Sequence, residues 1–282
     1  LATELALIDL SEKLVEAEIK DLQNAREYLP KCDIYGGSNY KLAANSTIII
    51  MCCSTPLVPG ETKLNHVQRN LDAFKRIIPH IVESSPKSMI IVLARPVDIM
   101  TYIAWRLSGF PKNRVFGIGT MMESSKFRIA VSQKLSINAL SVNGYVFGEQ
   151  GANAECAGVK LRSVYPEFGT KADKEGYNFI PQEITESDNN IDKAKGCGSW
   201  SLGLATCRVC EAVLHDLNLI FPLSTYAKGM QGIDRDIFIS LPCLVNANGV
   251  RGILFQQLSD DEKDLLTASA KQMDELIQSI EW

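Results

Sequence analysis

Short aliphatic segments with little alternation between polar and apolar residues constrain the fold of this chain more than any other feature. Glu4 to Asp9, Thr47 to Cys53 and Met89 to Ala94 are segments of this kind. Such runs are typical of strands that are buried on both faces of a parallel sheet. At 282 residues, the chain fits one two-lobed α/β unit better than two independent domains.

Composition and charge exclude several classes of protein. The formal net charge is -4, which gives no electrostatic reason to expect binding to nucleic acid. The apolar runs are far shorter than the roughly 20 residues that span a bilayer, and no targeting segment is visible. Eight cysteines occur at irregular spacing without a secretory pattern. They indicate a reducing compartment, so we expect the chain to be cytoplasmic.

Asp9 ends the first predicted strand and precedes a helix that we predict from Ser11 to Gln23. In dinucleotide-binding folds, a carboxylate at this position accepts hydrogen bonds from the ribose hydroxyls of the cofactor. A strand-end aspartate can instead cap the helix that follows it. Taken alone, the residue favours the capping role.

The usual metal-binding residue types do not form a recognisable metal site. Cys207 and Cys210 form a C-x-x-C pair in the middle of a predicted helix, with no second pair, so we do not expect zinc. The three histidines are His66, His80 and His215. His66 lies on the helix predicted behind a loop of turn formers, and the other two lie near helix ends, where solvated or capping roles are common.

The stretch from Gly117 to Gly151 holds the densest group of candidate functional residues. It contains a short apolar strand, a helix that opens with the sequence MESSKFR at residues 122–128, a second strand, and the glycine-flanked pair Glu149-Gln150. This stretch resembles the catalytic segment of the L-lactate and malate dehydrogenase family. In that family the helix opens with the sequence LDSARFR and the later loop reads GEHG. The order and spacing of the two motifs are therefore those of the family, while several side chains differ.

Further motifs extend the resemblance over essentially the whole chain. They are LIDLSEKL at residues 7–14, LNHVQRNLDAFKRIIP at residues 64–79, and RPVD at residues 95–98 where the family has NPVD. The first of these matches favours ribose binding over capping for Asp9. The resemblance implies a Rossmann-type doubly wound parallel sheet, followed by a C-terminal α+β substrate lobe. We expect the nucleotide-binding domain at residues 1–120 and the substrate domain at residues 121–282.

Two departures from the family pattern concern segments rather than single residues. No G-x-G-x-x-G phosphate loop occurs in the sequence, so we expect the nucleotide-binding domain to lack its first βα unit and the sequence to be truncated. Loss of that central strand would expose two neighbouring strand edges. Ala152 to Glu155 stands where the family has about eleven residues, including a strand of ordinary length. Either that strand is lost or residues are missing.

Reduction of a 2-oxo acid requires a hydride donor, a proton for the carbonyl oxygen, and a cation that binds the carboxylate. In the resembled family, a histidine exchanges the proton, an aspartate orients its ring, and arginines bind the carboxylate and polarise the carbonyl. By position, the resemblance assigns the catalytic places to Gln150, Glu123, Lys126, Lys63 and, where the family has a substrate-contacting threonine, Gly198. It assigns the cofactor-binding places to Asp9, Pro56, Arg95 and Leu202.

Gln150 is the substitution with the largest expected effect, because a carboxamide has no protonation change near physiological pH. It cannot act as an acid or a base, although its amide can still donate a hydrogen bond to Glu123. Lys126 and Lys63 supply point charges where the family has the planar fork of arginine. These swaps retain charge, which is consistent either with a pocket that still binds an anion or with drift in a pocket no longer selected for turnover.

These substitutions lead to two hypotheses about function. The first is a catalytically impaired, lactate dehydrogenase-like protein that keeps the scaffold of an NAD-dependent 2-hydroxy acid oxidoreductase. The second is an active NAD-dependent oxidoreductase on a different 2-oxo or 2-hydroxy acid, with water or Lys63 supplying the proton. We favour the first. The resemblance implies NAD as the cofactor, although its phosphate loop is absent from this sequence, and a small anion as the ligand. It also implies a homodimer or homotetramer that forms through the helix at Leu64 to Glu83 and the second lobe.

Overall fold

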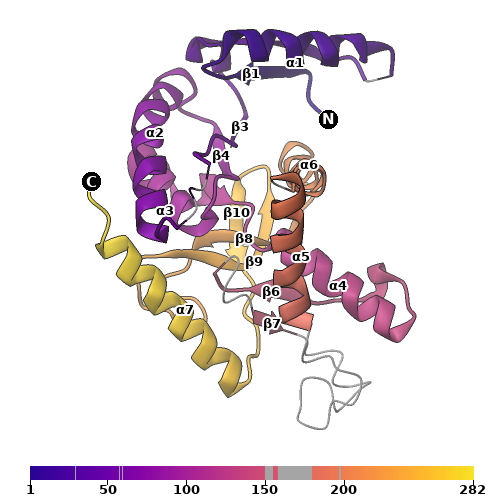
Figure 1. Ribbon diagram of the computed structural model, residues 1–282, viewed down its shortest axis with the longest axis vertical. Coiled ribbons are helices and arrows are strands. Elements are labelled where there is room, and N and C mark those ends of the chain that lie inside the picture. Colours follow the sequence, from indigo (N-terminus) through magenta and orange to yellow (C-terminus); the bar gives the residue numbers. More distant parts are fainter. Residues whose placement is uncertain (29, 57, 59, 150–154, 158–179, 197) are drawn as a thin grey trace.

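The computed structural model describes residues 1–28, 30–56, 58, 60–149, 155–157, 180–196 and 198–282, and its elements alternate in the α/β manner (Figure 1). The first part contains β1 (Glu4–Ile8), α1 (Glu12–Asn24), β2 (Asp33–Gly37), β3 (Ile48–Met51), α2 (Lys63–Ser84), β4 (Met89–Val92), α3 (Val97–Ser108) and β5 (Val115–Gly117). The second part contains α4 (Met121–Leu135), β6 (Tyr145–Phe147), β7 (Glu155–Ala157), α5 (Ile180–Lys195), α6 (Trp200–Leu214), β8 (Leu219–Tyr226), β9 (Phe238–Asn246), β10 (Gly249–Ile253) and α7 (Asp260–Gln278).

A six-stranded sheet forms the centre of the molecule, in the order β10-β9-β8-β5-β4-β3. Strands β3, β4 and β5 are parallel, whereas β8 pairs antiparallel with both β5 and β9. The sheet therefore joins a parallel portion to an antiparallel portion, and these correspond to the expected Rossmann-type part and the α+β lobe. The predicted α/β fold class is confirmed.

Two helical layers cover the central sheet, and β4 shows how the sequence divides between them. Ile90 and Val92 belong to the hydrophobic cluster that includes α2, α3 and α7, whereas Ile91 belongs to the cluster that includes α6. This division follows from the two-residue period of a strand. Figure 1 shows α2, α3 and α7 together and α6 separate from them.

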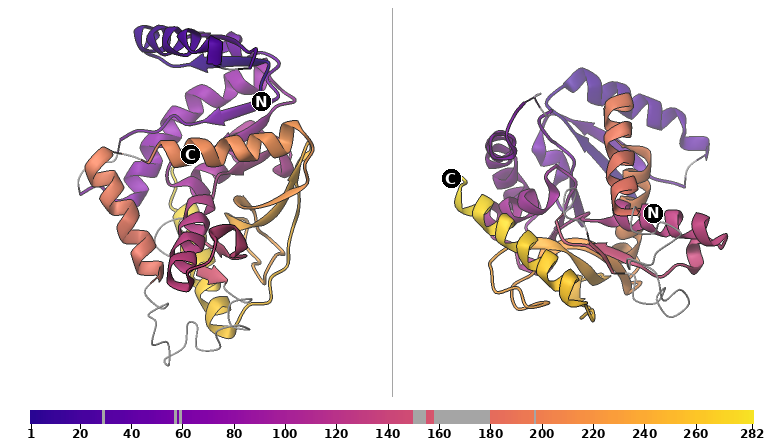
Figure 2. Two further views of the ribbon diagram at one scale, coloured as in Figure 1. Left: turned by 90° about the vertical axis from the view of Figure 1, so that its right-hand side faces the viewer. Right: turned by 60° about the horizontal axis from the view of Figure 1, so that its bottom comes forward.

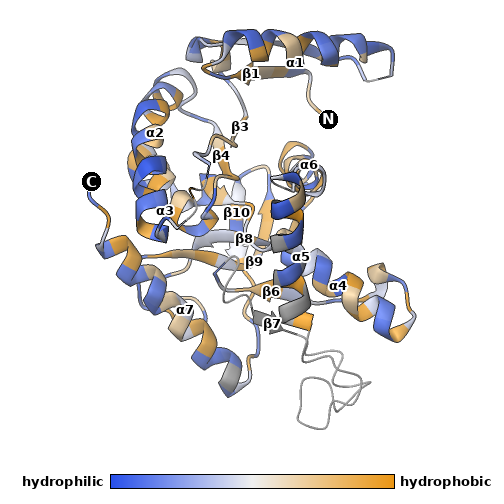
Figure 3. Cartoon of the chain, viewed as in Figure 1, coloured by the Kyte–Doolittle hydropathy of each residue, from blue (hydrophilic) through white to orange (hydrophobic). Residues whose placement is uncertain are grey.

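Helix α2 buries one apolar stripe, whose residues recur at helical spacing. Its apolar residues Val67, Leu71, Phe74, Ile78 and Ile81 are buried. Hydrophilic residues occupy much of the rest of the helix, so both colours alternate along α2 in Figure 3. The apolar stripe faces the sheet and fixes the start of the helix, which carries Lys63, relative to the strands.

Strands β1 and β2 form a separate parallel pair, with Glu4 opposite Asp33 and Ile8 opposite Gly37. Together with α1 they lie at one end of the molecule (Figures 1 and 2). The prediction that Glu4 to Asp9 is buried on both faces is wrong, because no residue from Glu4 to Ile8 is fully buried. Within the described residues, β1 pairs only with β2 and β3 pairs only with β4, so each has one neighbour rather than two.

A third hydrophobic cluster supports the loop that follows β6. It includes Phe127 and Val131 of α4, Val146 of β6, and Ile180 and Ile184 of α5. Strand β6 pairs antiparallel with β7, which lies in the region where the sequence left open the loss of a strand. Across the described part of the chain, no helix combines the length and apolar character needed to cross a bilayer.

Candidate active site

The loop after β6 is fixed by two other elements of the fold. The backbone of Gly148 forms a bridge with Ser240 of β9, with N–H···O distances of 3.0 and 3.1 Å. The next residue, Glu149, donates its backbone N–H to the Ser269 hydroxyl of α7 at 3.2 Å. The carboxylate of Glu149 is buried, with its side chain only 6% exposed. The backbone up to position 149 is therefore held by β9 and α7 together.

Lys63 meets this loop from the start of α2. Thr62 caps the helix by accepting a hydrogen bond from the Asn65 backbone N–H at 3.2 Å. The Lys63 ammonium group then forms an ion pair with the carboxylate of Glu149. A lysine that the resemblance places in the substrate lid is thus joined to the loop that precedes Gln150.

A second buried carboxylate lies near Lys63. Asp98 of α3 is 2% exposed and accepts a hydrogen bond from the Ser240 hydroxyl at 3.2 Å. Burial lowers the pKa of Lys63 below its ordinary value, and the charge of Asp98 opposes this shift without reversing it. The site therefore gathers one cation and two carboxylates from α2, α3 and the loop after β6.

The described residues of the loop before α2, which the resemblance places in the substrate lid, are bound to that helix by the side chains of His66, Arg69 and Asn70. Asn70 accepts from the Thr55 backbone N–H at 2.8 Å, and His66 Nε2 lies 2.9 Å from the Thr55 carbonyl oxygen. Arg69 donates to both carboxylate oxygens of Glu61, at 2.7 and 2.6 Å. His66 lies on α2 behind this loop, as expected, and is buried there.

Glu123 and Lys126 lie in the first two turns of α4. This end of the helix is fixed to β6, because the hydroxyls of Thr120 and Ser124 both donate to the Val146 carbonyl oxygen. Glu123 is 5% exposed, and a carboxylate in the first turn is stabilised by the helix dipole. Lys126 is half-buried. Gln150, which the resemblance places at the acid/base position, lies outside the described residues.

The predicted cofactor-binding residues are spread over several elements. Asp9 is exposed at the end of β1, and its Oδ1 accepts from the Ser11 backbone N–H at 2.8 Å. Pro56 is exposed and its carbonyl oxygen accepts from Arg69 at 2.8 Å. Arg95 is exposed between β4 and α3, and Leu202 is half-buried on α6.

Gly198 lies just before α6 and is half-buried. A Cβ atom built there would meet a single neighbour, Ile191 Cγ2, at 3.8 Å. That distance is ordinary van der Waals contact, so the backbone has room for a larger residue. The glycine is not required by crowding at this position.

The carboxyl ends of β1 and β3 lie close enough for their side chains to interact. The charge of Asp9 contributes to raised pKa values of both Tyr40 and Cys53, although burial is the larger cause in each case. Ligands of open α/β sheets bind outside the carboxyl ends of the strands. An exposed carboxylate at this edge fits the ribose hydroxyls of a dinucleotide. Its contact with Ser11 is compatible with that role and also with the capping alternative.

Sequence reasoning missed the partners of Lys63. Glu149 and Asp98 were both read as parts of matching motifs, without an expected contact. Glu149 adjoins Gln150, and that adjacency was the available signal. Asp98 ends the RPVD motif, which carries no signal of a position near Lys63.

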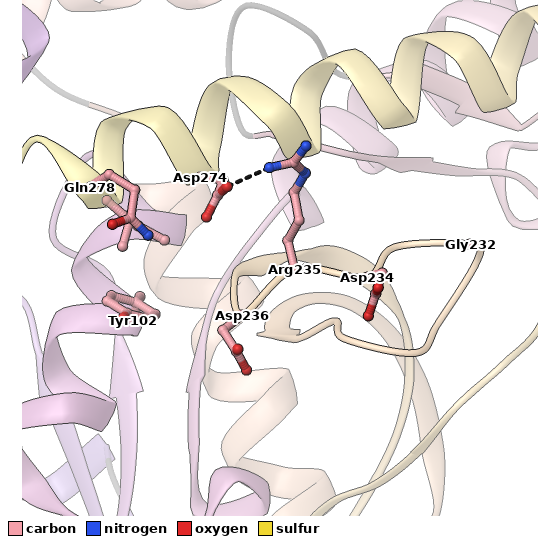
Figure 4. Close-up of a pocket in the computed structure, with 8 residues that line it drawn as sticks. Tyr102, Gly232, Asp234, Arg235, Asp236, Asp274 and Gln278 are labelled. Carbon is pink, nitrogen blue, oxygen red and sulfur yellow. Dashed lines mark hydrogen bonds and ion pairs between the residues drawn. The ribbon is translucent and has the colours of Figure 1, made fainter.

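A separate hollow of about 530 Å³ lies between α7 and the segment that joins β8 to β9 (Figure 4). Three of its charged groups are engaged, since Arg235 pairs with Asp274, and Asp236 pairs with Lys228 and accepts from the Tyr226 hydroxyl. None of the predicted site residues lines it. The ion pair of Arg235 with Asp274 joins α7 to the segment between β8 and β9, away from the candidate active site.

The fold and the site together define a class of protein. The chain has parallel strands, an aspartate at the end of β1, and a second lobe with a charged loop. These features are typical of a two-domain dinucleotide-binding α/β protein. Residues 1–117 match the family model described as lactate/malate dehydrogenase, NAD binding domain. Residues 120–281 match the lactate/malate dehydrogenase, alpha/beta C-terminal domain. The chain belongs to the lactate/malate dehydrogenase family, and the first match supports NAD as its cofactor.

Individual relatives agree with the family match. The chain is 39% identical over 277 residues to the L-lactate dehydrogenase A chain of Pelodiscus sinensis japonicus. It is 38% identical over 278 residues to the L-lactate dehydrogenase B chain of Xenopus laevis, and 40% identical over 277 residues to the B chain of Homo sapiens. In each case the match covers 96% of this chain and 83% of the relative.

Proposed function

We propose that this chain is a lactate dehydrogenase-like protein that retains the NAD-dependent 2-hydroxy acid oxidoreductase scaffold and is catalytically impaired toward lactate and pyruvate. One observation carries the proposal beyond the substitution at Gln150. Lys63, at the position of the carbonyl-polarising arginine, is committed to an ion pair with the buried carboxylate of Glu149. A cation held in this way is not free to stabilise charge on a substrate oxygen.

The reaction class specifies what each position must do. NADH, when bound, supplies a hydride to the carbonyl carbon of a 2-oxo acid. Asp9 would hold the ribose and Leu202 would pack against the cofactor, while Lys126 would attract the substrate carboxylate. The proton that completes the hydroxyl group must come from an acid at position 150, and Gln150 has none to give at neutral pH.

The size of the expected loss follows from these roles. Removal of a positioned acid/base group costs about 10² to 10⁴ in rate. Loss of a bidentate charge contact costs about 2 to 4 kcal/mol, by comparison with the loss of other electrostatic stabilisers. The two effects are not additive, but both lower turnover. Retained binding of a small anion remains compatible with the lysines at positions 63 and 126.

A second candidate function is favoured by the lowered pKa of Lys63, which burial causes. A desolvated lysine can act as an acid or base at lower pH than an exposed one. In that case the protein is an active NAD-dependent oxidoreductase on another 2-oxo or 2-hydroxy acid. The proton then comes from Lys63 or from water.

The test is NADH oxidation with pyruvate, oxaloacetate and larger 2-oxo acids. The proposal predicts turnover far below about 1 s⁻¹, the lower end of typical enzymes. NADH binding is measured separately by calorimetry, so that a lack of cofactor binding is distinguished from a lack of chemistry. Turnover above that level with pyruvate contradicts impairment, and turnover with a larger 2-oxo acid alone supports the second function.

We further propose that the protein works as a homodimer or homotetramer in a reducing compartment such as the cytoplasm. Trp200 and Leu204 are strongly exposed on α6, which is unusual for large apolar residues in an isolated subunit. Among the described cysteines, Cys32, Cys52, Cys53, Cys207, Cys210 and Cys243 are free thiols. Sedimentation equilibrium of the purified protein measures the subunit number, and a monomer at micromolar concentration contradicts this part of the proposal.

A further inference from the structure

Lys63 lies beside carboxylates whose positions are fixed by other parts of the fold. Glu149 follows the Gly148–Ser240 backbone bridge, and its N–H is bound to Ser269. The other carboxylate, Asp98, is held by the Ser240 hydroxyl. Both acidic side chains are buried. The lysine, by contrast, has a flexible stem and remains 45% exposed, so it is the partner that can move.

The lid loop does not depend on this ion pair for its attachment to α2. Arg69 binds Glu61 and the Pro56 carbonyl oxygen, while Asn70 binds Thr55. These contacts use side chains of α2 other than Lys63. Breaking the Lys63–Glu149 pair would therefore release the ammonium group without releasing the loop.

The charges around Lys63 determine how an anion can bind there. The Lys63 ammonium group is in contact with the carboxylate of Glu149, and the charge of Asp98 also acts on it. An incoming carboxylate is repelled by Glu149 unless it takes the place of Glu149 at Lys63. The interaction of two unit charges at contact in a partly exposed site is large enough to control binding.

We propose that Glu149 is a positioning residue that occupies the anion-binding side of Lys63, so that a small carboxylate ligand gains Lys63 only when the ammonium group leaves the Glu149 carboxylate for the ligand. The inference rests on the proposed function, because it assigns the ligand to the same pocket. The proposed function concerns turnover, whereas this inference concerns the protein without a ligand, in which Lys63 is paired with Glu149. Its consequence is that the chain carries an internal competitor for the anion it binds.

The first test measures acylation of Lys63 by an amine-reactive ester, quantified by peptide mass spectrometry against the exposed Lys20 of α1. Glu149→Gln removes the charge and keeps the shape, and we expect the Lys63 rate to rise about fivefold. Fivefold corresponds to about 1 kcal/mol, the upper value for a partly exposed ion pair. Glu61→Gln is the matched control, because it breaks an ion pair of the same lid that does not involve Lys63, and it should leave the rate unchanged.

The second test measures binding of oxamate, a small monoanion shaped like a 2-oxo acid, by calorimetry. Oxamate should bind Glu149→Gln about fivefold more tightly than the wild type and Glu61→Gln. If Glu149→Gln does not fold, the wild type alone decides, because saturating oxamate bound at Lys63 in place of Glu149 should slow the acylation of Lys63. An unchanged Lys63 rate in folded Glu149→Gln, or in the wild type with saturating oxamate bound, overturns the inference. Faster acylation in Glu149→Gln without oxamate binding to any variant overturns the exchange of Glu149 for a ligand, whereas the proposed impairment is decided separately by the NADH oxidation assay.

Discussion

The ammonium group of Lys63 contacts the carboxylate of Glu149, and this ion pair joins the start of α2 to the loop that follows β6. The two residues come from the two parts of the chain that match separate domain models. By the resemblance, Lys63 stands at a catalytic position and Glu149 directly precedes another, Gln150. The pair therefore links the lid and the catalytic loop in a way that the family motifs do not reveal.

The lowered pKa of Lys63 predicts a pH-dependent stability. Because its folded-state pKa lies below its unfolded value, the unfolded chain binds more protons between the two values. The contribution of Lys63 to stability should therefore rise with pH up to about 10.5, its ordinary pKa. Urea unfolding of the wild type and Lys63→Met at pH 8, 9 and 10 measures the difference, which should grow with pH in favour of the wild type.

Lys228 provides the control of opposite sign. Its hydrogen bond to Asp236 raises the pKa of Lys228 above the ordinary value. Its stabilising contribution is thus complete below the unfolded pKa and is lost only at higher pH, as the pH passes through the folded pKa. Lys228→Met should show a constant difference from the wild type between pH 8 and 10. A constant difference for Lys63→Met as well would show that burial does not lower its pKa.

Gly119, between β5 and α4, is predicted to be intolerant of any side chain. Its φ of +56° lies in the left-handed region, and a Cβ would lie 2.6 Å from the Ser224 backbone N. Gly119→Ala should lower the free energy of unfolding by about 3 kcal/mol, through strain and overpacking. Gly203→Ala, in α6 with no atom within 4 Å of the added Cβ, should raise it by about 0.5 to 1 kcal/mol. Similar effects for both variants in urea unfolding would contradict the close approach at Gly119.

Ser240 supports the site through both its backbone and its side chain. Ser240→Ala keeps the bridge to Gly148 and removes the 3.2 Å hydrogen bond from the hydroxyl to Asp98. Because Asp98 is buried, we expect a loss of about 1 to 3 kcal/mol in the free energy of unfolding. Ser279→Ala, which removes an exposed hydroxyl bonded to the Glu275 carbonyl oxygen, should change it by less than about 0.5 kcal/mol. If both variants lose the same free energy of unfolding, the contact between Ser240 and Asp98 does not contribute as predicted.

The elements of the fold were predictable wherever a local pattern decided them. The apolar residues of α2 recur at helical spacing and form its buried face, and Gly109, with a φ of 64°, follows the last residue of α3 as a glycine commonly does. The aliphatic run at β1 identified a strand correctly but not its burial. A strand's own sequence indicates that it pairs, and it does not say how many neighbours pair with it.

The motifs gave candidate site positions but no contacts between them. Lys63, Glu123 and Lys126 were assigned by their places in the family motifs, and their roles stay predictions. The ion pair with Glu149 depends on where the start of α2 lies relative to the loop after β6, which sequence spacing does not specify. The buried position of His66 depends likewise on the path of the loop at Thr55. Contacts between distant segments are set by packing, so motifs alone do not give them.

Restoring histidine at position 150 alone is not expected to restore lactate dehydrogenase activity. Gln150→His supplies an acid/base group. The residue at the carboxylate-binding position is still Lys126, however, and Lys63 is still paired with Glu149. We expect kcat/KM for pyruvate to rise by no more than about tenfold, below the 10² to 10⁴ that a positioned acid/base group contributes. Steady-state kinetics of the purified variant measures it. Full recovery from this single change would show that the lysine substitutions and the ion pair matter little.

The central claim is that no group at position 150 exchanges a proton near neutral pH. Its most direct test is the pH dependence of kcat/KM for NADH-dependent reduction of pyruvate between pH 5 and 9. The account predicts a rate at least 10² below that of a typical enzyme, without an ionisation between pH 6 and 8. Turnover above about 1 s⁻¹ governed by a single ionisation near pH 7 would contradict it.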